Sequence, residues 1–583
     1  MTLQAPGKAQ HRSTSLTRFL PILGWLPRYN RAWFMGDIIA GLSVWALMVP
    51  QSLGYADISG VPVQYGLYAA AIALLVFPLF TTSRHVVTGP SSTISAVTGS
   101  AVLLVTTSGS AEAIQLVAAI TVLAGLLYLI LAVLKMGWIS NFLSESVLTG
   151  FIFGIGIDVV IGQLKKITGS PQSGDTAWQK LFSWIQGLPE ANIPTVIIGV
   201  GLIILLVLLH RYAPKVPGAL VAVVIGIGAA MLLPLADMGV ALTGPVPRGL
   251  PSFALPSLSF IAQNAAVIIP AAFGVMLVGF SESLAAARQY ASKYHYDIDI
   301  DQEMLAQGAA NAASGLFQGV NVDGSLSKSA LNDSSGAKTQ LASIAQGIFV
   351  ILTLLLLAPL FANLPSAALG AIVITAVVFG LFKVKEMRRL LRLARTEFWF
   401  ALAALLGVLT FGTLPGVFIG VGLSLLWLIW RTSHPAIPVL GRAADGRSYH
   451  SLDNHPDSTT FPGLVIIRFD GPLFFATAGS LRARIRELTH EMEPPVQAVL
   501  LDMESTTIID LEGSDELKEV AKELKEVGIA LHLARVKENI RQTLVRDGVL
   551  ETIPEANFHT SVESAMEAAQ NHPTTILEQV NDH

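Results

Sequence analysis

Two short polar motifs interrupt long apolar stretches of this sequence, one in each half. In the first half, Thr88-Gly89-Pro90-Ser91-Ser92 follows a break at Pro50-Gln51-Ser52. In the second half, Gly324-Ser325-Leu326-Ser327 follows the pair Glu282-Ser283 at a similar separation. Such residues can cap and open a half-helix in the middle of a membrane, and two facing helix N-termini form an anion site from backbone N–H groups. The spacing therefore predicts anion transport.

Glu282 has the clearest functional signal among the ionisable residues, because it closely follows the apolar stretch from Ile268 to Phe280. An ionisable side chain within a membrane span is costly and is a functional candidate by default. We expect Glu282 to carry a coupling proton, since its protonation would favour an anion bound beside it. It could instead coordinate sodium with Ser283 and nearby carbonyl oxygens, because hard cations prefer oxygen ligands. A permanent ion pair with Lys328 is the structural alternative.

Composition places these motifs in a membrane protein. Of the 583 residues, 52% are hydrophobic and 13% are charged, whereas ordinary soluble domains carry about 25% charged residues. A typical soluble enzyme is therefore excluded. The net charge of −4 argues against a nucleic-acid binder, which would need a basic surface. The lack of cysteine excludes disulfides, thiolate zinc sites and iron–sulfur clusters, and no cofactor is expected beyond a coupling sodium ion or proton.

Apolar segments long enough to be membrane-span candidates fall into two groups of seven, given that a spanning helix needs about 20 mostly apolar residues. They are 37–57, 66–82, 90–106, 113–135, 141–163, 194–212 and 218–235, then 265–288, 303–320, 325–336, 339–362, 366–382, 396–412 and 415–432. An odd number of spans in each half inverts the second half relative to the first, as in inverted-repeat transporters. We therefore predict an α-helical polytopic membrane protein with 14 transmembrane segments as a 7+7 inverted repeat.

Lys and Arg concentrate in alternate short loops, which places the N-terminus in the cytosol by the positive-inside rule. We predict a cytosolic N-terminal arm at 1–34 and a transport domain at 35–435, with repeats at about 35–235 and 262–435. The basic run at 383–395 predicts an amphipathic helix at the inner surface. Residues 436–583 predict a soluble cytosolic domain. The protein is thus expected in the inner (plasma) membrane, with both termini cytosolic.

Several other residues have structural interpretations. Asp301 and Glu303 are expected to cap the helix that starts near residue 303. Gly150 and Gly154 suit close packing of helices rather than chemistry. The tail predicts a small parallel α/β sandwich with buried strands at 464–469, 496–501 and 528–534 and helices at 479–492, 514–527 and 537–547.

In combination, these residues resemble the SulP sulfate permease family, the relatives of the animal anion exchangers that include pendrin and prestin. The resemblance runs through most of the chain. It is carried by Gly36-Asp37 with Ala40-Gly41-Leu42, Pro50-Gln51-Ser52 with Tyr55-Ala56, Gly66-Leu67-Tyr68, Ser83-Arg84, Gly89-Pro90, Gln302-Glu303, Gly308, Asn311 and the segment from Gly336 to Gln340. It implies a homodimer in which a core domain (spans 1–4 and 8–11) moves against a gate domain (spans 5–7 and 12–14), with the anion between spans 3 and 10.

The resemblance also implies a binding site built from both halves of the chain. Residue by residue, it assigns anion binding to Gln51, Tyr55, Ser91, Ser92, Ser325, Leu326, Ser327, Lys328 and Ser329, and it places Glu282 at the same site. Cation coupling at Glu282, with Ser283 as a helper, is the expectation from the residues themselves. Lys328 stands where many relatives have Arg. Arg binds an oxyanion with a rigid planar fork, whereas Lys is a mobile point charge, so selectivity among sulfate, bicarbonate and carboxylates is expected to differ.

The tail resembles the STAS domain that follows the membrane domain in SulP proteins. Residues 471–475, 501–502 and 509–513 carry this match. In the related anti-sigma-factor antagonists, a serine at the start of the second helix is phosphorylated. Glu512 stands there, so a phospho-switch at that residue is not expected. No Walker loop or dinucleotide fingerprint occurs in the tail, and we expect dimer contacts or a cytosolic regulatory partner instead of catalysis.

Three classes of function remain open. The first is a secondary active transporter of inorganic anions, with sulfate favoured, coupled to protons or sodium and working by elevator-like alternating access. The second is an alternative activity on the same fold: a sodium-coupled bicarbonate transporter, or a passive anion exchanger or channel. A membrane enzyme is disfavoured because the chain lacks a histidine-rich metal cluster, a cysteine nucleophile and a Walker motif. Expected partners are the anion, the lipid bilayer and a second copy of the chain, and no nucleic acid.

Overall fold

The computed structural model describes residues 19–142, 144–214, 216–491 and 495–571. The chain divides between Leu425 and Leu426 into two compact units. This point lies inside helix α19 (Thr413–Ser433), and the domain boundary predicted after residue 435 stays a prediction. Residues 1–18 of the predicted N-terminal arm and 572–583 of the predicted tail lie outside the described residues.

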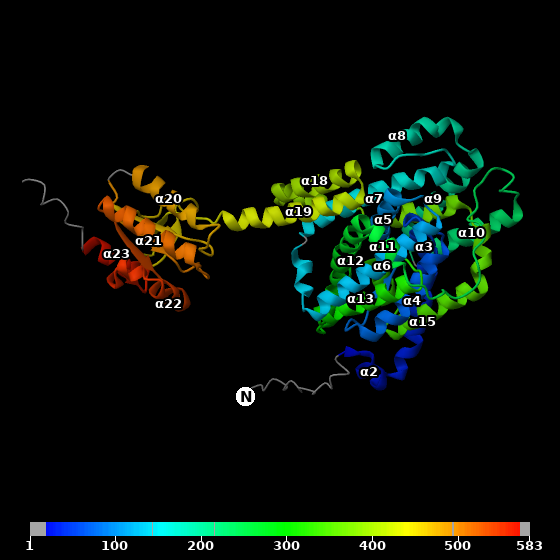
Figure 1. Cartoon of the computed structure of the whole chain (residues 1–583), viewed down its shortest axis with the longest axis horizontal. Coiled ribbons are helices and arrows are strands. Elements are labelled where there is room, and N and C mark those ends of the chain that lie inside the picture. The colour runs from blue at the N-terminus through cyan, green and yellow to red at the C-terminus, as the bar shows by residue number, and fades with distance from the viewer. Residues whose placement is uncertain (1–18, 143, 215, 492–494, 572–583) are drawn as a thin grey trace, which may run out of the picture. The chain divides into compact units, whose positions relative to one another are not determined.

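The first unit is almost entirely helical (Figure 1). Its helices are α2 (Ile22–Trp25), α3 (Phe34–Ile58), α4 (Gln64–Phe80), α5 (Ser92–Val105), α6 (Ala111–Val133), α7 (Glu145–Thr168), α8 (Ala177–Gly187), α9 (Ile193–Tyr212), α10 (Gly218–Leu232), α11 (Leu258–Gln263), α12 (Ala265–Tyr294), α13 (Ile300–Leu316), α14 (Leu326–Ser334), α15 (Leu341–Leu352), α16 (Ser366–Gly380), α17 (Val384–Leu393), α18 (Arg395–Phe411) and most of α19. Each predicted span overlaps one of these helices, and α17 lies within the predicted amphipathic segment. The short helices α2, α8 and α11 have no counterpart in the prediction.

Helix lengths separate the long apolar helices from the two that follow the polar motifs. Among the described residues, 8 helices are long and apolar enough to cross a membrane. In contrast, α5 has 14 residues and α14 has 9 residues, which correspond to about 21 Å and about 14 Å. A hydrocarbon core is about 30 Å thick. The helices that follow the two polar motifs are therefore half-helices.

A two-stranded ribbon joins the halves of the unit just before these half-helices. Strands β1 (Val87–Gly89) and β2 (Asp323–Ser325) pair antiparallel, with Thr88 opposite Gly324. Helix α5 begins shortly after β1, and α14 begins directly after β2. Because the strands are antiparallel, the two half-helices leave opposite ends of the ribbon. This arrangement is consistent with the predicted 7+7 inverted repeat.

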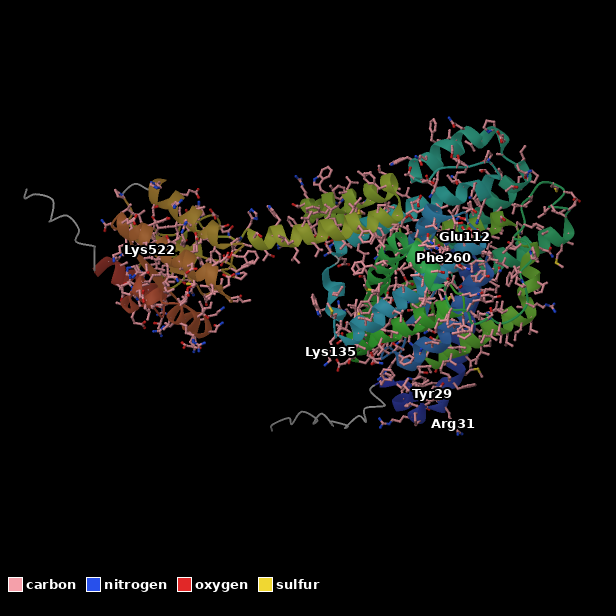
Figure 2. The ribbon with its side chains drawn as sticks, viewed as in Figure 1. Tyr29, Arg31, Glu112, Lys135, Phe260 and Lys522 are labelled. Carbon is pink, nitrogen blue, oxygen red and sulfur yellow. The ribbon has the colours of Figure 1, made fainter. Side chains whose placement is uncertain are left out.

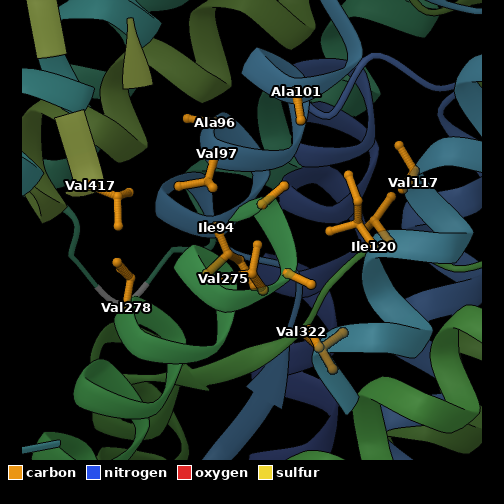
Figure 3. Close-up of a cluster of buried hydrophobic side chains, with 14 of the residues drawn as sticks. Ile94, Ala96, Val97, Ala101, Val117, Ile120, Val275, Val278, Val322 and Val417 are labelled. Carbon is orange, nitrogen blue, oxygen red and sulfur yellow. The ribbon is translucent and has the colours of Figure 1, made fainter. Parts of the chain in front are cut away.

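The long helices pack in two sets that correspond to the predicted core and gate spans. In the first set, α4 and α6 pack on α13, α3 and α4 on α15, and α12 on α5 and α6. In the second set, α7 packs on α18, α16 and α9. A cluster of buried, mostly aliphatic side chains fills the interior around the first set, including Ile94 and Val97 of α5, Ile120 of α6 and Val275 of α12 (Figure 3).

Two glycines of α7 act as packing residues, as predicted. A Cβ atom at Gly150 would lie 1.9 Å from the carbonyl oxygen of Ala401 in α18. A Cβ atom at Gly154 would lie 2.9 Å from the carbonyl oxygen of Leu405 on the same helix. Both positions bring the backbones of α7 and α18 into contact, so a larger residue would force these helices apart.

The predicted cap of helix α13 is wrong. The N-cap is Asp299, whose side chain accepts a hydrogen bond from the N–H group of Asp301. Glu303 is buried and accepts hydrogen bonds of 2.6 to 2.9 Å from backbone and hydroxyl donors of Thr81, Thr82 and Ser83. The first turn of α13 meets the loop before β1, so this carboxylate binds loop donors from another part of the chain instead of its own helix end.

The second unit is a small α/β domain, as the sequence predicts. After α19 it contains β3 (Leu440–Arg442), β4 (Tyr449–Ser451), β5 (Leu464–Arg468), α20 (Ala478–Glu491), β6 (Ala498–Asp502), α21 (Leu511–Glu526), β7 (Ala530–Ala534), α22 (Glu538–Arg546), β8 (Phe558–His559) and α23 (Val562–Asn571). Strands β5, β6, β7 and β8 form a parallel sheet in that order. Apolar side chains are buried in two clusters around this sheet, and charged side chains such as Lys522 of α21 lie on the surface (Figure 2).

A pair of histidines makes this domain sensitive to acid. Nδ1 of His532 in β7 lies 3.0 Å from Nε2 of His559 in β8. Burial, and to a smaller extent the neighbouring His559, lowers the pKa of His532 to about 4. An unfolded chain binds this proton below about pH 6.5. The stabilising contribution is therefore complete above pH 6.5 and is lost as pH falls towards 4, by up to about 1.4 kcal/mol per pH unit.

Urea unfolding of the separately expressed domain at neutral and mildly acidic pH measures this loss. His532→Leu should reduce the pH dependence, because it removes the more deeply buried imidazole of the pair. His490→Gln is the matched control, since His490 is exposed on α20. Equal acid sensitivity in the original domain and in His532→Leu would contradict the prediction.

Candidate functional site

A cavity of about 1030 Å³ lies in the first unit and contains most of the predicted site on its wall. The predicted residues that line it are Gln51 and Tyr55 from α3, Ser91 and Ser92 at the start of α5, Glu282 from α12, and Ser325, Leu326, Ser327 and Lys328 at the start of α14. Ser283 and Ser329 do not line it. The fold thus brings nine of the eleven predicted residues together, and their roles in binding stay predictions.

Helix α3 presents two of these side chains through an irregular segment. Pro50 lies within the helix, where it lacks an N–H group and frees a carbonyl oxygen of the preceding turn. Gln51 and Tyr55 follow on the next turns and are each 6% exposed. The Gln51 Oε1 atom has no hydrogen-bond partner among the described residues, so a polar group remains available at the cavity wall.

The first turns of α5 and α14 contribute backbone N–H groups to the same cavity. Ser91 is the N-cap of α5 and Ser325 is the N-cap of α14, where its side chain accepts a hydrogen bond from the backbone N–H of Lys328 at 3.5 Å. The N-terminus of a helix carries partial positive charge and unsatisfied N–H donors. Two such ends on one cavity favour an anion.

Lys328 is a buried cation between these elements. It is 1% exposed, its Nζ atom donates a hydrogen bond to the carbonyl oxygen of Pro90, and this nitrogen lies 5.6 Å from the centre of the Tyr55 ring. No carboxylate of the described residues lies within ion-pair distance of it, and the alternative of a permanent pair with Glu282 is therefore wrong. The ammonium group is held by a neutral oxygen and can attract an anion in the cavity.

Space for this lysine depends on Gly89 in β1. A Cβ atom there would lie 2.7 Å from Met48 Cε and 3.6 Å from the Nζ atom of Lys328. A side chain at this position would displace the end of Met48 and crowd the ammonium group. Gly89 of the first polar motif thus allows the side chains of Met48 and Lys328 to approach the β1 backbone closely.

The two remaining predicted residues hold the ribbon in place. Ser283 donates to the carbonyl oxygen of Gly279 and accepts from the N–H of Gly324, both at 2.7 Å. Ser329 donates to the carbonyl oxygen of Ser325 at 2.6 Å and accepts from the N–H of Val87 at 2.9 Å. Both hydroxyls are engaged by the scaffold, and neither residue lines the cavity. The predicted roles of Ser283 in cation coupling and of Ser329 in anion binding stay predictions.

Asp323 is a component of the site that the sequence analysis missed. It is 0% exposed, and its Oδ2 atom accepts a hydrogen bond of 2.8 Å from the Ser91 hydroxyl. It interacts electrostatically with both Glu282 and Lys328. Asp323 is isolated from other charged residues between Glu303 and Lys328 in the sequence. An isolated ionisable residue within predicted membrane spans is the kind of signal that singled out Glu282, and it could have found Asp323.

Comparison with known proteins assigns this combination of fold and site to a class. The model of the sulfate permease family matches residues 34–404, and that of the STAS domain matches residues 455–565. The protein is thus a multi-pass membrane protein that belongs to the sulfate permease family, with a C-terminal STAS domain.

Individual relatives agree with this class. A probable sulfate transporter of Mycobacterium tuberculosis is 34% identical over 552 residues, which cover 94% of this chain and 98% of the relative. The chloroplastic sulfate transporter 4.1 of Arabidopsis thaliana is 30% identical over 568 residues, covering 94% of this chain and 82% of the relative. Among solved structures, the murine Solute Carrier 26 family member A9 anion transporter in the inward-facing state matches with a TM-score of 0.86 at 24% identity, covering 97% of this chain and 96% of that chain.

Proposed function

We propose that the protein is a secondary active transporter of inorganic anions, with sulfate as the favoured substrate and bicarbonate as the second candidate. One observation carries the proposal: the N-termini of α5 and α14 open on one cavity, with the ammonium group of Lys328 between them. Helix ends and an unpaired cation recognise negative charge. Relatives named as sulfate transporters that align over nearly the whole chain support sulfate as the first anion to test.

An elevator-like movement would carry the anion through the membrane. The proposed binding residues come from α3, α5 and α12 of the first (core) set of helices, and from α14, which packs on α3 and α12. The gate set supplies other parts of the cavity wall, including Thr149 of α7, His210 of α9 and Thr375 of α16. A site contributed by one set can move with that set past the other.

Glu282 is the residue that we propose to couple transport to a cation. Its side chain lines the cavity that holds the proposed anion site. A proton on this carboxyl group removes a negative charge beside the anion, so proton binding and anion binding favour each other. Sodium is the second candidate ion, since a carboxylate can supply an oxygen ligand.

Uptake into liposomes tests the proposed function. The purified protein is reconstituted, and uptake of labelled sulfate or bicarbonate is measured with an imposed proton or sodium gradient. We expect one gradient to drive uptake of one anion, and Glu282→Gln to abolish that drive. Uptake that is indifferent to both gradients and to Glu282→Gln would indicate a passive exchanger or channel instead.

We also propose that the STAS domain serves regulation or assembly of a homodimer. Truncation after Ser433, the last residue of α19, should leave the first unit folded because the buried clusters of the two units are separate. We expect monodisperse protein with reduced transport or reduced dimer content, measured by size-exclusion chromatography with light scattering and by uptake. Complete loss of folded protein would contradict this division of roles.

A further inference from the structure

Asp323 is a buried carboxylate next to the proposed anion site, and it has no role in the transport steps described above. It is the first residue of β2, opposite Gly89 of β1, and it is 0% exposed. Its Oδ2 atom accepts from Ser91, while its Oδ1 atom is buried and has no hydrogen-bond partner among the described residues. A buried carboxylate with an unsatisfied oxygen is costly when ionised, and a proton on that carboxyl group would reduce the cost.

Titratable groups surround Asp323 from four neighbouring helices. They are Tyr55 of α3, Tyr128 of α6, Glu282 of α12 and Lys328 of α14. The Tyr128 hydroxyl is also buried without a hydrogen-bond partner in the described part of the chain. A Cβ atom on Gly279 would lie 3.0 Å from that hydroxyl and 3.4 Å from the Asp323 Cβ, so the glycine lets these groups approach each other.

Asp323 and Glu282 lie close together, because Ser283, the chain neighbour of Glu282, accepts a hydrogen bond of 2.7 Å from the N–H of Gly324, the chain neighbour of Asp323. Lys328 interacts with Asp323 and with Glu282, and Lys383 interacts with Glu282. Around Asp323 itself, two carboxylates thus share one ammonium group. Like charges in close proximity resist simultaneous ionisation, and such a pair takes up and releases protons as a unit. An incoming anion adds further negative charge and so increases the affinity of the pair for a proton.

We propose that Asp323 and Glu282 act as one pair that takes up a single proton when the anion binds, so that Asp323 helps to set the proton stoichiometry of transport. The proton comes from water in the cavity on the side where the anion enters, and it returns to water with the anion on the other side. Only an O–H bond forms and breaks. This inference rests on the proposed function, because it describes the coupling step of that same site.

The pH dependence of sulfate affinity tests the pair in the purified full-length protein. With one proton taken up per anion, sulfate affinity is constant at low pH and falls by about tenfold per pH unit above the midpoint. Asp323→Asn keeps the side-chain size and an acceptor for Ser91 but removes the charge. We expect this variant to bind sulfate with little pH dependence and, at alkaline pH, at least tenfold more tightly than the original protein.

Glu112→Gln is the matched control, because this carboxylate is exposed at the start of α6 (Figure 2). It should keep the original pH profile. A profile in Asp323→Asn that is as steep as in the original protein would overturn the inference. If Glu282→Gln alone flattened it, the proposed function would stand while Asp323 would be a structural residue.

Two further outcomes distinguish failure of the proton pair from failure of the proposed anion transport. Affinity that follows sodium concentration at fixed pH would overturn the proton pair but not anion transport. Failure of the original protein to bind sulfate or bicarbonate would overturn the proposed function and the inference with it. If Asp323→Asn does not fold, Ser91→Ala replaces it. This variant loses the hydrogen bond that favours the ionised form of Asp323, so the midpoint of the pH dependence of sulfate affinity should move to higher pH. An unchanged midpoint would contradict the proposed pair.

Discussion

Replacing Lys328 with methionine is expected to weaken sulfate binding by about thirtyfold or more. Removal of one partner from a buried, hydrogen-bonded charge pair has an effect of this size. Methionine keeps an unbranched apolar stem but removes the ammonium group. The side chain is 1% exposed and its Nζ atom donates to the carbonyl oxygen of Pro90. No protein carboxylate of the described residues pairs with it, so the charge that is lost is the charge available to an anion.

Titration of the purified variant with sulfate measures this effect, and its thermal midpoint shows whether it folds. Lys328→Arg is the matched substitution, because it retains the charge and changes its geometry to a planar fork. It should retain binding and change the ratio of sulfate to bicarbonate affinity. If every tested anion bound to Lys328→Met as tightly as to the original protein, Lys328 would be a structural residue.

The second large effect is expected at Gly150, where alanine should destabilise the protein by at least about 3 kcal/mol, the upper end of typical overpacking costs. The added Cβ atom would lie 1.9 Å from the oxygen and 2.5 Å from the carbon of the Ala401 carbonyl. These are backbone atoms of α18, so no rotation of a side chain relieves the clash. Helices α7 and α18 would have to separate.

Gly162→Ala provides a control on the same helix, because nothing lies within 4 Å of a Cβ atom at that position. Alanine there should stabilise the helix slightly, by up to about 1 kcal/mol. Thermal unfolding of both variants in detergent, followed by size-exclusion chromatography, distinguishes the two sites. Equal thermal midpoints for Gly150→Ala and Gly162→Ala would contradict the prediction, because they would show that α7 and α18 can separate at little cost in stability.

Local patterns in the sequence were sufficient to predict the helical segments, the half-helices after Gly89 and Gly324, and the strands and helices of the tail. Apolar runs, helix breakers and capping residues act over a few residues, so they can be read without knowledge of distant contacts. The residue-by-residue assignment of the nine candidates that line one cavity came from the resemblance to the SulP family.

The sequence by itself thus determined the class of fold and the segments that supply the site. Only the tertiary structure decided what individual polar groups do: Ser283 and Ser329 hold the ribbon, Glu303 binds the loop before β1, and Asp323 lies behind the cavity wall. The physical reason is that a buried polar side chain takes whichever partner the packing brings to it. Those partners come from segments more than 200 residues away for Ser329, Glu303 and Asp323, and they meet only when β1 pairs with β2 and α13 packs beside α4.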